Sequence, residues 1–439
     1  MSEKKLFAKY VSQNILGMVG ISLYILADTF FIAQGVGADG ITALNLVLPI
    51  YSVIFAVGSM IGVGSSIRFA VARSRGDREA DSYFMNAILC SAVLGILLSL
   101  TGFFLPDKIV ALMGGDAAIV EVGSIYTRIF MTLTPFFMWN SICNAFVRND
   151  GAPTVAMLAT LLSSLFNIVA DYVLMFPLGL GMAGAALATA CSPIVGVLIC
   201  CIHFFSKRNT ISFRLVRPSL RRLLHSCQVG VSAFTGEISS GVTTTAFNFI
   251  ILGLVGNTGV AAYGVVANIA IVAVSAFNGI ANGSQPLISD FFGKGQQKKV
   301  QRILGYGIAT ALVLSVLMIA AVYLWTAPIA GIFNREQDPM LAAYAQEGLR
   351  LYFLGFLFAG INILGTGVLS AAEAARGAFA ASILRGFAAI LVCAFGLSSL
   401  LGLTGVWLAF PAAELLTLPV TVWALWKAVY RQGNRSPVS

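Results

Sequence analysis

The feature that most constrains this chain is a succession of apolar stretches that are each long enough to cross a lipid bilayer. A membrane-spanning helix needs about 20 mostly apolar residues, and the 439 residues contain twelve candidates. They lie near residues 10–33, 45–70, 84–105, 125–147, 154–176, 183–205, 227–254, 260–283, 303–326, 348–370, 379–399 and 404–428. Only 10% of the residues are charged, against roughly 25% in soluble proteins. The sequence therefore predicts an all-α polytopic membrane protein, and it excludes soluble enzymes, secreted disulfide scaffolds and disordered chains.

The positions of the basic residues test these boundaries independently, because cytoplasmic loops of membrane proteins are enriched in Lys and Arg. With a cytoplasmic N-terminus, 23 of the 27 basic residues fall on inner segments. The other four are Lys108, Arg128, Arg335 and Arg350. An even number of spans then predicts that both termini are cytoplasmic. The net charge of +9 is interpreted as an orientation signal, and nucleic acid is not an expected partner.

Cysteine and histidine usage gives no indication of metal or disulfide chemistry. The seven cysteines lie in or beside apolar stretches and form no CxxC pair, which is typical of small buried side chains. Only His203 and His225 are present, whereas a zinc site needs three or four ligands. We therefore expect no cofactor and no enzymatic activity. The apolar run after Lys9 is predicted to be a first spanning helix, not a removable signal peptide.

The two halves of the chain resemble each other at a fixed spacing. A shift of 219 residues, rising to 221 later in the chain, superimposes glycines in order: Gly17 on Gly236, Gly37 on Gly256, Gly76 on Gly295 and Gly184 on Gly405. The alternative is a set of twelve similar apolar helices. We predict two six-helix lobes, at 1–205 and 227–439, joined by a basic cytoplasmic linker at 206–226. An even number of spans per half predicts parallel repeats, which are a feature of transporters.

Four acidic residues fall inside predicted spans. They are Asp28, Asp171, Glu237 and Glu414. A charge at membrane depth costs at least about 2.5–3.5 kcal/mol, so such residues are functional candidates that face the bundle interior. Arg385 is predicted to lie near a helix end, and no Lys or Arg is expected well inside a span. Internal ion pairs are therefore not expected for these acids.

Two of the acids belong to a polar cluster in the first half. Asn167 and Asp171 are four residues apart, so their side chains share one helix face. Thr189 lies in the small-residue run that begins at Gly184, which permits close helix approach, and Asp28 lies toward the outer end of the first span. Carboxylate, amide and hydroxyl oxygens suit Na⁺, and two neighbouring carboxylates also suit a proton. The alternative role for all four is hydrogen bonding between helices.

The second half has apolar residues at the repeat positions of this cluster. The counterparts are Phe247, Ala388, Val392 and Phe410. The cluster is thus not required by the repeated architecture, which favours a functional role for Asp28, Asn167, Asp171 and Thr189.

The remaining candidates have two open interpretations each. Glu237, surrounded by Ser and Thr, could bind a cationic substrate or a proton, or be satisfied by hydroxyl groups. Glu414, between Pro411 and Pro419, could serve transport or stabilise a kink. Aromatic side chains that could line a substrate site through stacking and cation–π contact, or else pack toward lipid, are Phe136, Phe137, Trp139, Tyr263 and Phe277.

Several segments together resemble the multidrug and toxic compound extrusion (MATE) family. The stretch Asp28-Thr-Phe-Phe-Ile-Ala-Gln-Gly-Val-Gly37, followed by Ala43 and Pro49, is similar to the first-helix signature of the family. Other recurrent family segments are resembled by Gly62-Val-Gly-Ser65, Arg148-Asn-Asp-Gly151 and Gly181-Met-Ala-Gly184. The resemblance covers essentially the whole chain and looks closest to the DinF-like branch, which includes MepA-type bacterial pumps.

This resemblance implies a monomeric multidrug antiporter in the bacterial plasma (inner) membrane, coupled to H⁺ or Na⁺. It implies export of organic cations and amphipathic compounds by alternating access. In that branch the ion site consists of a helix-one carboxylate, Asn and Asp on helix five, and Thr on helix six. Asp28, Asn167, Asp171 and Thr189 match these positions.

The chain also departs from patterns found in parts of the family. No proline precedes the acid of the first helix, where Ser12-Gln13-Asn14 stands, so a proline-dependent bend is not expected. Leu351 to Ser370 contains no acid, unlike helix ten of another branch.

Three rival interpretations of the function are compared with the sequence. A lipid-linked oligosaccharide flippase of the same superfamily would tend toward about fourteen spans and a basic cavity. A narrow metabolite exporter would share the predicted fold. A channel or membrane-embedded enzyme would need a pore motif or a catalytic constellation, and neither is found. The sequence leaves open the substrate, the coupling ion and the stoichiometry.

Overall fold

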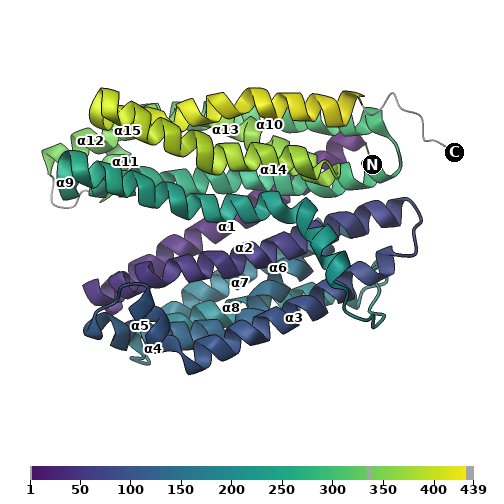
Figure 1. Cartoon of the computed structure of the whole chain (residues 1–439), viewed down its shortest axis with the longest axis horizontal. Helices are drawn as coiled ribbons and strands as arrows, with labels where there is room; N and C mark the ends of the chain where they lie inside the picture. Colours follow the sequence, from purple (N-terminus) through teal and green to yellow (C-terminus); the bar gives the residue numbers. More distant parts are fainter. Residues whose placement is uncertain (1, 334–337, 432–439) are drawn as a thin grey trace. The chain divides into compact units, whose positions relative to one another are not determined.

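The computed structural model describes residues 2–333 and 338–431, and among these it contains helices and no strands. Figure 1 shows these helices in sequence colours. The first half contains α1 Glu3–Gly35, α2 Ala38–Ser74, α3 Ala80–Phe104, α4 Pro106–Leu112, α5 Ala117–Thr132, α6 Thr134–Asn149, α7 Pro153–Met175 and α8 Gly181–Phe204.

The second half repeats this order. It contains α9 Leu220–Gly293, α10 Gln297–Leu324, α11 Thr326–Phe333, α12 Pro339–Phe353, α13 Phe356–Ala371, α14 Ala375–Ile383, the π-helix η1 Leu384–Ala388, α15 Ala389–Leu425 and the π-helix η2 Trp426–Arg431. In both halves a short helix, α4 or α11, precedes a pair of consecutive helices, α5–α6 or α12–α13. The predicted repeat is therefore present in the order of the elements.

The helices account for the twelve predicted spans. Among the described residues, eight helices are long and apolar enough to cross a membrane, and α12 with α13, bent by 50°, makes a ninth span. Two of the eight each contain two spans, because the backbone leaves helical geometry at Gly256 inside α9 and at Gly402 inside α15. The twelfth is α5 with α6, the first-half counterpart of the bent pair.

Glycines with positive φ mark the same turns in both halves. Gly37 (φ 84°) corresponds to Gly256 (φ 71°), and Gly76 (φ 74°) to Gly295 (φ 68°), as the 219-residue shift predicts. Glycine adopts this left-handed region without the steric cost that a Cβ atom brings. The repeat read from sequence is thus confirmed at the turns.

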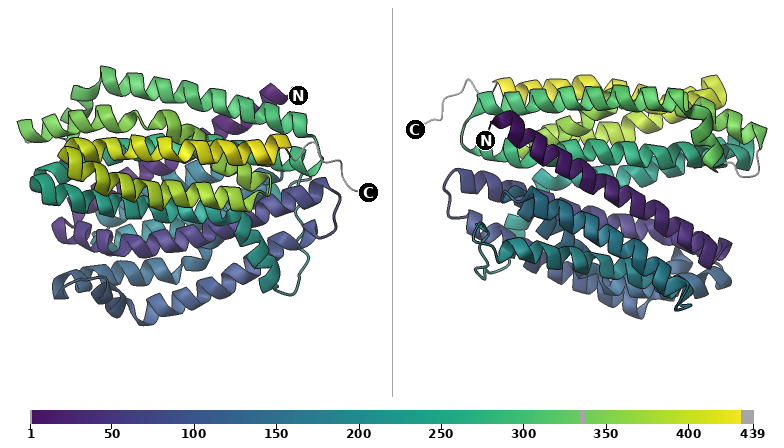
Figure 2. Two further views of the ribbon diagram at one scale, coloured as in Figure 1. Left: turned by 45° about the horizontal axis from the view of Figure 1, so that its top comes forward. Right: turned by 180° about the vertical axis from the view of Figure 1, so that it is seen from behind.

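Two compact units make up the chain. The N-unit is Leu16–Glu237, and the C-unit is Met1–Ile15 with Ile238–Ser439. The helices α1 and α9 each contribute to both units, and Figure 2 shows α1 in purple as one continuous helix. Each unit has its own apolar core between its helices.

The burial pattern corrects one detail of the repeat. Buried residues of α7 include Ala156, Ala159, Asn167 and Asp171. The residues 222 positions later are also buried: Ala378, Ala381, Ala389 and Cys393. Val392, which a 221-residue shift pairs with Asp171, is 70% exposed. The counterparts of Asn167 and Asp171 are therefore Ala389 and Cys393, still without a charge or an amide.

Candidate cation site

The four residues of the predicted cluster are all buried within the N-unit. Asp28 on α1 and Thr189 on α8 are 8% and 6% exposed, whereas Asn167 and Asp171 on α7 are 0% exposed. The side chains of Asp28 and Asp171 lie close enough to interact directly with each other. The structure therefore brings three helices together around two carboxyl groups.

Close contact between α7 and α8 positions the second half of this cluster. A Cβ atom on Gly184 would lie 2.9 Å from the carbonyl carbon of Leu174, so only glycine permits this approach. The alanines that follow Gly184 on α8 are almost fully buried. At this spacing the Asn167 Nδ2 donates a hydrogen bond of 3.3 Å to Thr189 Oγ1. The predicted role of the small-residue run is thus confirmed.

Several oxygen atoms of the cluster have no hydrogen-bond partner among the described residues. They are Asp28 Oδ1, Asn167 Oδ1 and both carboxylate oxygens of Asp171. Buried acceptors without partners are costly, and none of the ion pairs between described residues involves Asp28 or Asp171. A hard cation such as Na⁺ takes oxygen ligands, and a proton converts one carboxylate into a donor. The oxygen atoms of the cluster fit either ion.

Three tyrosines that were not predicted from the sequence adjoin the cluster. Tyr24 precedes Asp28 by one helical turn, and its hydroxyl lies 3.1 Å from that of Tyr51 on α2. Tyr126 on α5 lies within electrostatic reach of Asp28 and beside Thr189. Only the i, i+4 spacing of Tyr24 and Asp28 was available as a signal, since the other contacts join distant helices.

The other candidate residues do not join this cluster directly. Glu237, on α9, is half-buried and within electrostatic reach of Tyr51. Phe136 and Trp139 are half-buried on α6, with ring centroids 5.2 Å apart. Three aromatics are buried in the apolar cores: Phe137, Tyr263 and Phe277. A role of these side chains in substrate binding stays a prediction.

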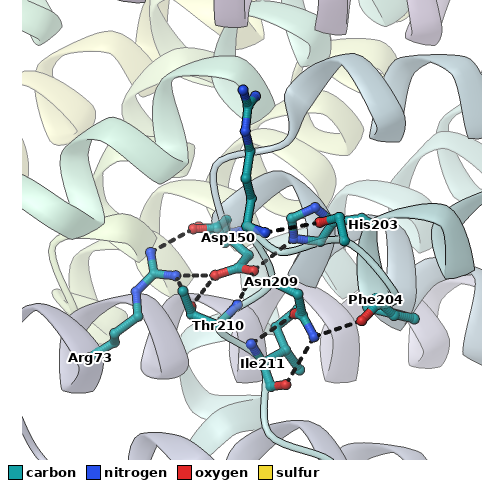
Figure 3. Close-up of polar contacts among 10 residues, drawn as sticks. Arg73, Asp150, His203, Phe204, Asn209, Thr210 and Ile211 are labelled. Carbon is teal, nitrogen blue, oxygen red and sulfur yellow. Dashed lines mark hydrogen bonds and ion pairs between the residues drawn. The ribbon is translucent and has the colours of Figure 1, made fainter.

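A second polar cluster lies at the end of α6, in the segment Arg148-Asn-Asp-Gly151. Figure 3 shows Arg73, His203 and Thr210 converging on the Asp150 carboxylate. His203 Nε2 lies 2.7 Å from Asp150 Oδ2, the Thr210 amide donates to the same oxygen at 2.9 Å, and Arg73 and the Thr210 hydroxyl bond Oδ1. The carboxylate thus joins α2 and α8 to the connection that follows α8.

The environment of Asp150 favours its ionised form. Burial by itself raises the pKa of this carboxyl, but hydrogen bonds from His203 and Thr210 and the nearby Arg73 guanidinium together hold the pKa below its usual value. All of these partners stabilise the negative charge. We interpret this cluster as a structural junction of the N-unit.

The structure overturns one expectation about the charged residues of the C-unit. Arg385 lies in η1, within the continuous helical stretch of α14, η1 and the first part of α15, ten residues after the start of this stretch at Ala375 and not near its end. Its Nε donates to Glu414 Oε1 at 2.5 Å. The expectation that spans contain no internal ion pair was therefore wrong. The pairing joins two consecutive spans across the break at Gly402, and spacing within a single helix does not reveal it.

Comparison with known proteins agrees with this architecture. The chain is 29% identical over 405 residues to the multidrug export protein MepA of Staphylococcus saprophyticus, covering 92% of this chain and 89% of that protein. It is 28% identical over 445 residues to MepA of Staphylococcus haemolyticus, covering 99% and 96% of the two chains. These relatives match along nearly the full length.

Solved structures share the same fold. An outward-facing multidrug resistance MATE family transporter of the MOP superfamily superimposes with a TM-score of 0.91 at 23% identity, over 98% of this chain and 96% of that chain. A MOP superfamily transporter from Pyrococcus furiosus, described as having a binding pocket of reverse polarity, gives a TM-score of 0.90 at 22% identity, over 99% and 98%.

A model of one family matches each half of the chain in turn. The MatE family model aligns with residues 14–173 and again with residues 237–395. Together these matches cover well over half of the sequence, and they restate the internal repeat. The chain is therefore a multi-pass membrane protein that belongs to the multidrug and toxic compound extrusion (MATE) family and has its twelve-helix, two-lobe fold.

Proposed function

We propose that this protein is a cation-coupled multidrug exporter that exchanges H⁺ or Na⁺ for organic cations and amphipathic compounds. The observation that carries the proposal is the buried cluster of Asp28, Asn167, Asp171 and Thr189, which contains two carboxyl groups and no base among its described partners. The relatives described as multidrug export proteins support the substrate class. We place it in a bacterial plasma membrane with cytoplasmic termini.

The chemistry of the cluster suggests how the ion could drive export. When the cluster is empty, two buried carboxylates repel each other and favour an arrangement of α1 that admits a counter-charge. Binding of Na⁺ or H⁺ neutralises Asp28 and Asp171 and lets α1 pack against α7 and α8. Cycling between these states is alternating access. Each positive charge that moves inward contributes about 2.3 kcal/mol per 100 mV of membrane potential, which can drive drug export.

Transport by everted membrane vesicles tests the proposal. With an imposed H⁺ or Na⁺ gradient, Asp28→Asn and Asp171→Asn are expected to fold but lose most of the uptake of a cationic dye such as ethidium. Glu347→Gln is the matched control, because Glu347 is a half-buried acid of the C-unit that lies outside the proposed site. Its Oε1 accepts a hydrogen bond of 2.6 Å from Thr404 Oγ1. Wild-type exchange by both aspartate variants would refute the assignment of the site.

The same vesicles separate the rival functions. Uptake of several cationic dyes by the wild type supports multidrug export. If the folded wild type moves none of them under either gradient, a narrow metabolite exporter or a lipid-linked flippase becomes the better description. Comparing Na⁺-free with Na⁺-containing buffer at a fixed pH gradient identifies the coupling ion.

A further inference from the structure

The C-unit contains a buried charged cluster that the proposed mechanism does not use. Glu414 on α15 is 2% exposed. Its Oε1 accepts from Arg385 Nε at 2.5 Å, and its Oε2 accepts from Asn362 Nδ2 at 2.8 Å. The same Asn362 amide also donates to the Glu414 backbone carbonyl at 2.8 Å. Both carboxylate oxygens are therefore engaged, one by a full positive charge.

The backbone around the cluster holds these three groups together. Arg385 lies in the π-helical segment η1, a departure from α-helical geometry that is frequent at functional sites. Asn362 is held against α15 by glycine contacts, because a Cβ atom on Gly365 would lie 2.3 Å from Thr421 Cγ2. Tyr352, from α12, also lies within electrostatic reach of both Arg385 and Glu414. The ion pair is thus built into a close-packed region.

The repeat places this ion pair beside the counterpart of the cation site. Arg385 precedes Ala389, the counterpart of Asn167, by four residues, so both lie on one helix face. Glu414 follows Phe410, the counterpart of Thr189, by four residues on the next span. The two helices are antiparallel, so both offsets point to the same end and amount to about one helical turn of 5.4 Å. In the N-unit the same positions hold Ser163 and Pro193, which carry no charge.

The charge balance of the two sites therefore differs. The N-unit cluster has two buried carboxyl groups and needs a mobile cation for neutrality. The C-unit cluster pairs one buried carboxylate with one guanidinium. An internal positive charge occupies the position at Glu414 that a mobile ion would otherwise need to fill.

We propose that Arg385 acts as a tethered cation that fills a latent ion site at Glu414, so that the C-unit stays neutral throughout the transport cycle. A substitution that removes this charge should convert Glu414 into a third acid, besides Asp28 and Asp171, that takes up a proton or Na⁺. The physical reason is that an uncompensated buried carboxylate is strongly destabilising and recovers neutrality by binding a cation. The inference goes beyond the proposed export function, because its primary test needs no transport.

Infrared spectra of the purified wild type and variants at neutral pH, compared as difference spectra, test this inference. In Na⁺-free buffer, Arg385→Met should show the carbonyl stretch of a protonated carboxylic acid, and the Arg385→Met/Glu414→Gln double variant should lack it. Arg385→Lys keeps the charge and should not show this new stretch. The spectra of the wild type and Glu414→Gln should not differ in this stretch. A Glu414-dependent stretch in the wild type, or none in Arg385→Met, would overturn the inference.

A thermal-stability cycle covers the case in which Arg385→Met does not fold. Glu414→Gln leaves the guanidinium without its counter-charge and should lower the melting temperature. The double variant should recover most of this loss, because replacing both partners of a buried ion pair by neutral groups is often neutral or stabilising. A double variant no more stable than Glu414→Gln would show that the two charges do not neutralise each other.

Transport provides a further readout that depends on the proposed function. If Asp28→Asn and Asp171→Asn transport normally while the infrared result holds, the proposed export mechanism is wrong and the tethered cation stands. The two proposals are therefore tested separately.

Discussion

At the scale of single residues, the cost of burying a charge decides which side chains matter. Asp28, Asp171, Glu414 and Asp150 are all buried, yet their surroundings differ. Glu414 and Asp150 each have a basic partner, whereas Asp28 and Asp171 have buried oxygens without a partner among the described residues. We interpret an acid with a basic partner as structural, and we propose that Asp28 and Asp171, which have none, bind a mobile ion.

The Asp150 junction gives a prediction about stability. Asp150→Asn should destabilise the protein by about 3–5 kcal/mol, the usual cost of removing one partner from a buried pair, because His203, Thr210 and Arg73 lose their common acceptor. Thermal unfolding in detergent, followed by tryptophan fluorescence, measures this. Asp290→Asn is the control, since the exposed Asp290–Lys294 pair is worth at most about 1 kcal/mol. Equal shifts in both variants would contradict the junction.

The pH dependence of this effect follows from the lowered pKa of Asp150. A carboxyl whose pKa is depressed on folding contributes its full stabilisation above its unfolded pKa, which is about 3.9 for Asp. The contribution is lost as the pH falls through the lower folded value. The difference in melting temperature between the wild type and Asp150→Asn should therefore be constant from neutral pH down to about 4 and shrink below it. A difference that shrinks between pH 7 and 5 would point to another group.

At the scale of helices, much of the site followed from sequence spacing and some of it did not. The Asn167–Asp171 spacing placed both side chains on one face of α7, and the run after Gly184 indicated the close approach of α8. Tyr126 and the Arg385–Glu414 pair were missed because they depend on which helices become neighbours. The π-helix η1 was also not predicted from the sequence, nor was the 222-residue offset, which holds on both sides of η1 at Ala378 and Cys393.

Close helix contact predicts a large effect of one added methyl group. A Cβ atom on Gly64 of α2 would lie 2.0 Å from the Ser226 carbonyl oxygen of α9, and the clash is with backbone. Gly64→Ala should therefore lower stability by about 1–3 kcal/mol, as overpacking does. Gly305→Ala on α10, with no atom within 4 Å, should be neutral or stabilising, since alanine favours helix over glycine by roughly 0.5–1 kcal/mol. The melting temperatures of the two variants test this prediction. An equal loss of stability in both variants would contradict it.

At the scale of the whole molecule, the long apolar stretches of the sequence predicted the twelve spans, and the ordered glycine matches predicted the repeat. Gly37 with Gly256 and Gly76 with Gly295 were paired by sequence and share positive φ in the structure. The sequence did not predict that α12 and α13 bend by 50°, or that α5 and α6 are separate helices. Pro135 stands at the start of α6 and Gly355 directly precedes α13, but Pro49 lies inside the continuous helix α2, so such residues alone do not locate the interruptions.

The even number of spans predicts that both ends of the chain lie on one side of the membrane. Reporter fusions active only in the cytoplasm should be active at both the N-terminus and the C-terminus, whereas a fusion in the outer turn at Gly114–Gly115 should be inactive. The reason is the concentration of basic residues on the predicted inner segments. Opposite locations for the two ends would require an odd number of spans.

The coupling of the buried carboxyl groups to drug binding is the central claim, and thermodynamic linkage tests it most directly. If one ion and one drug compete through Asp28 and Asp171, each must weaken the binding of the other by the same factor. We therefore measure the affinity of the purified protein for ethidium while raising Na⁺ or H⁺ separately. The wild type and Glu347→Gln should lose affinity as the coupling ion rises, and Asp28→Asn/Asp171→Asn should bind the dye independently of both ions. A double variant that keeps the wild-type dependence on either ion would contradict the claim.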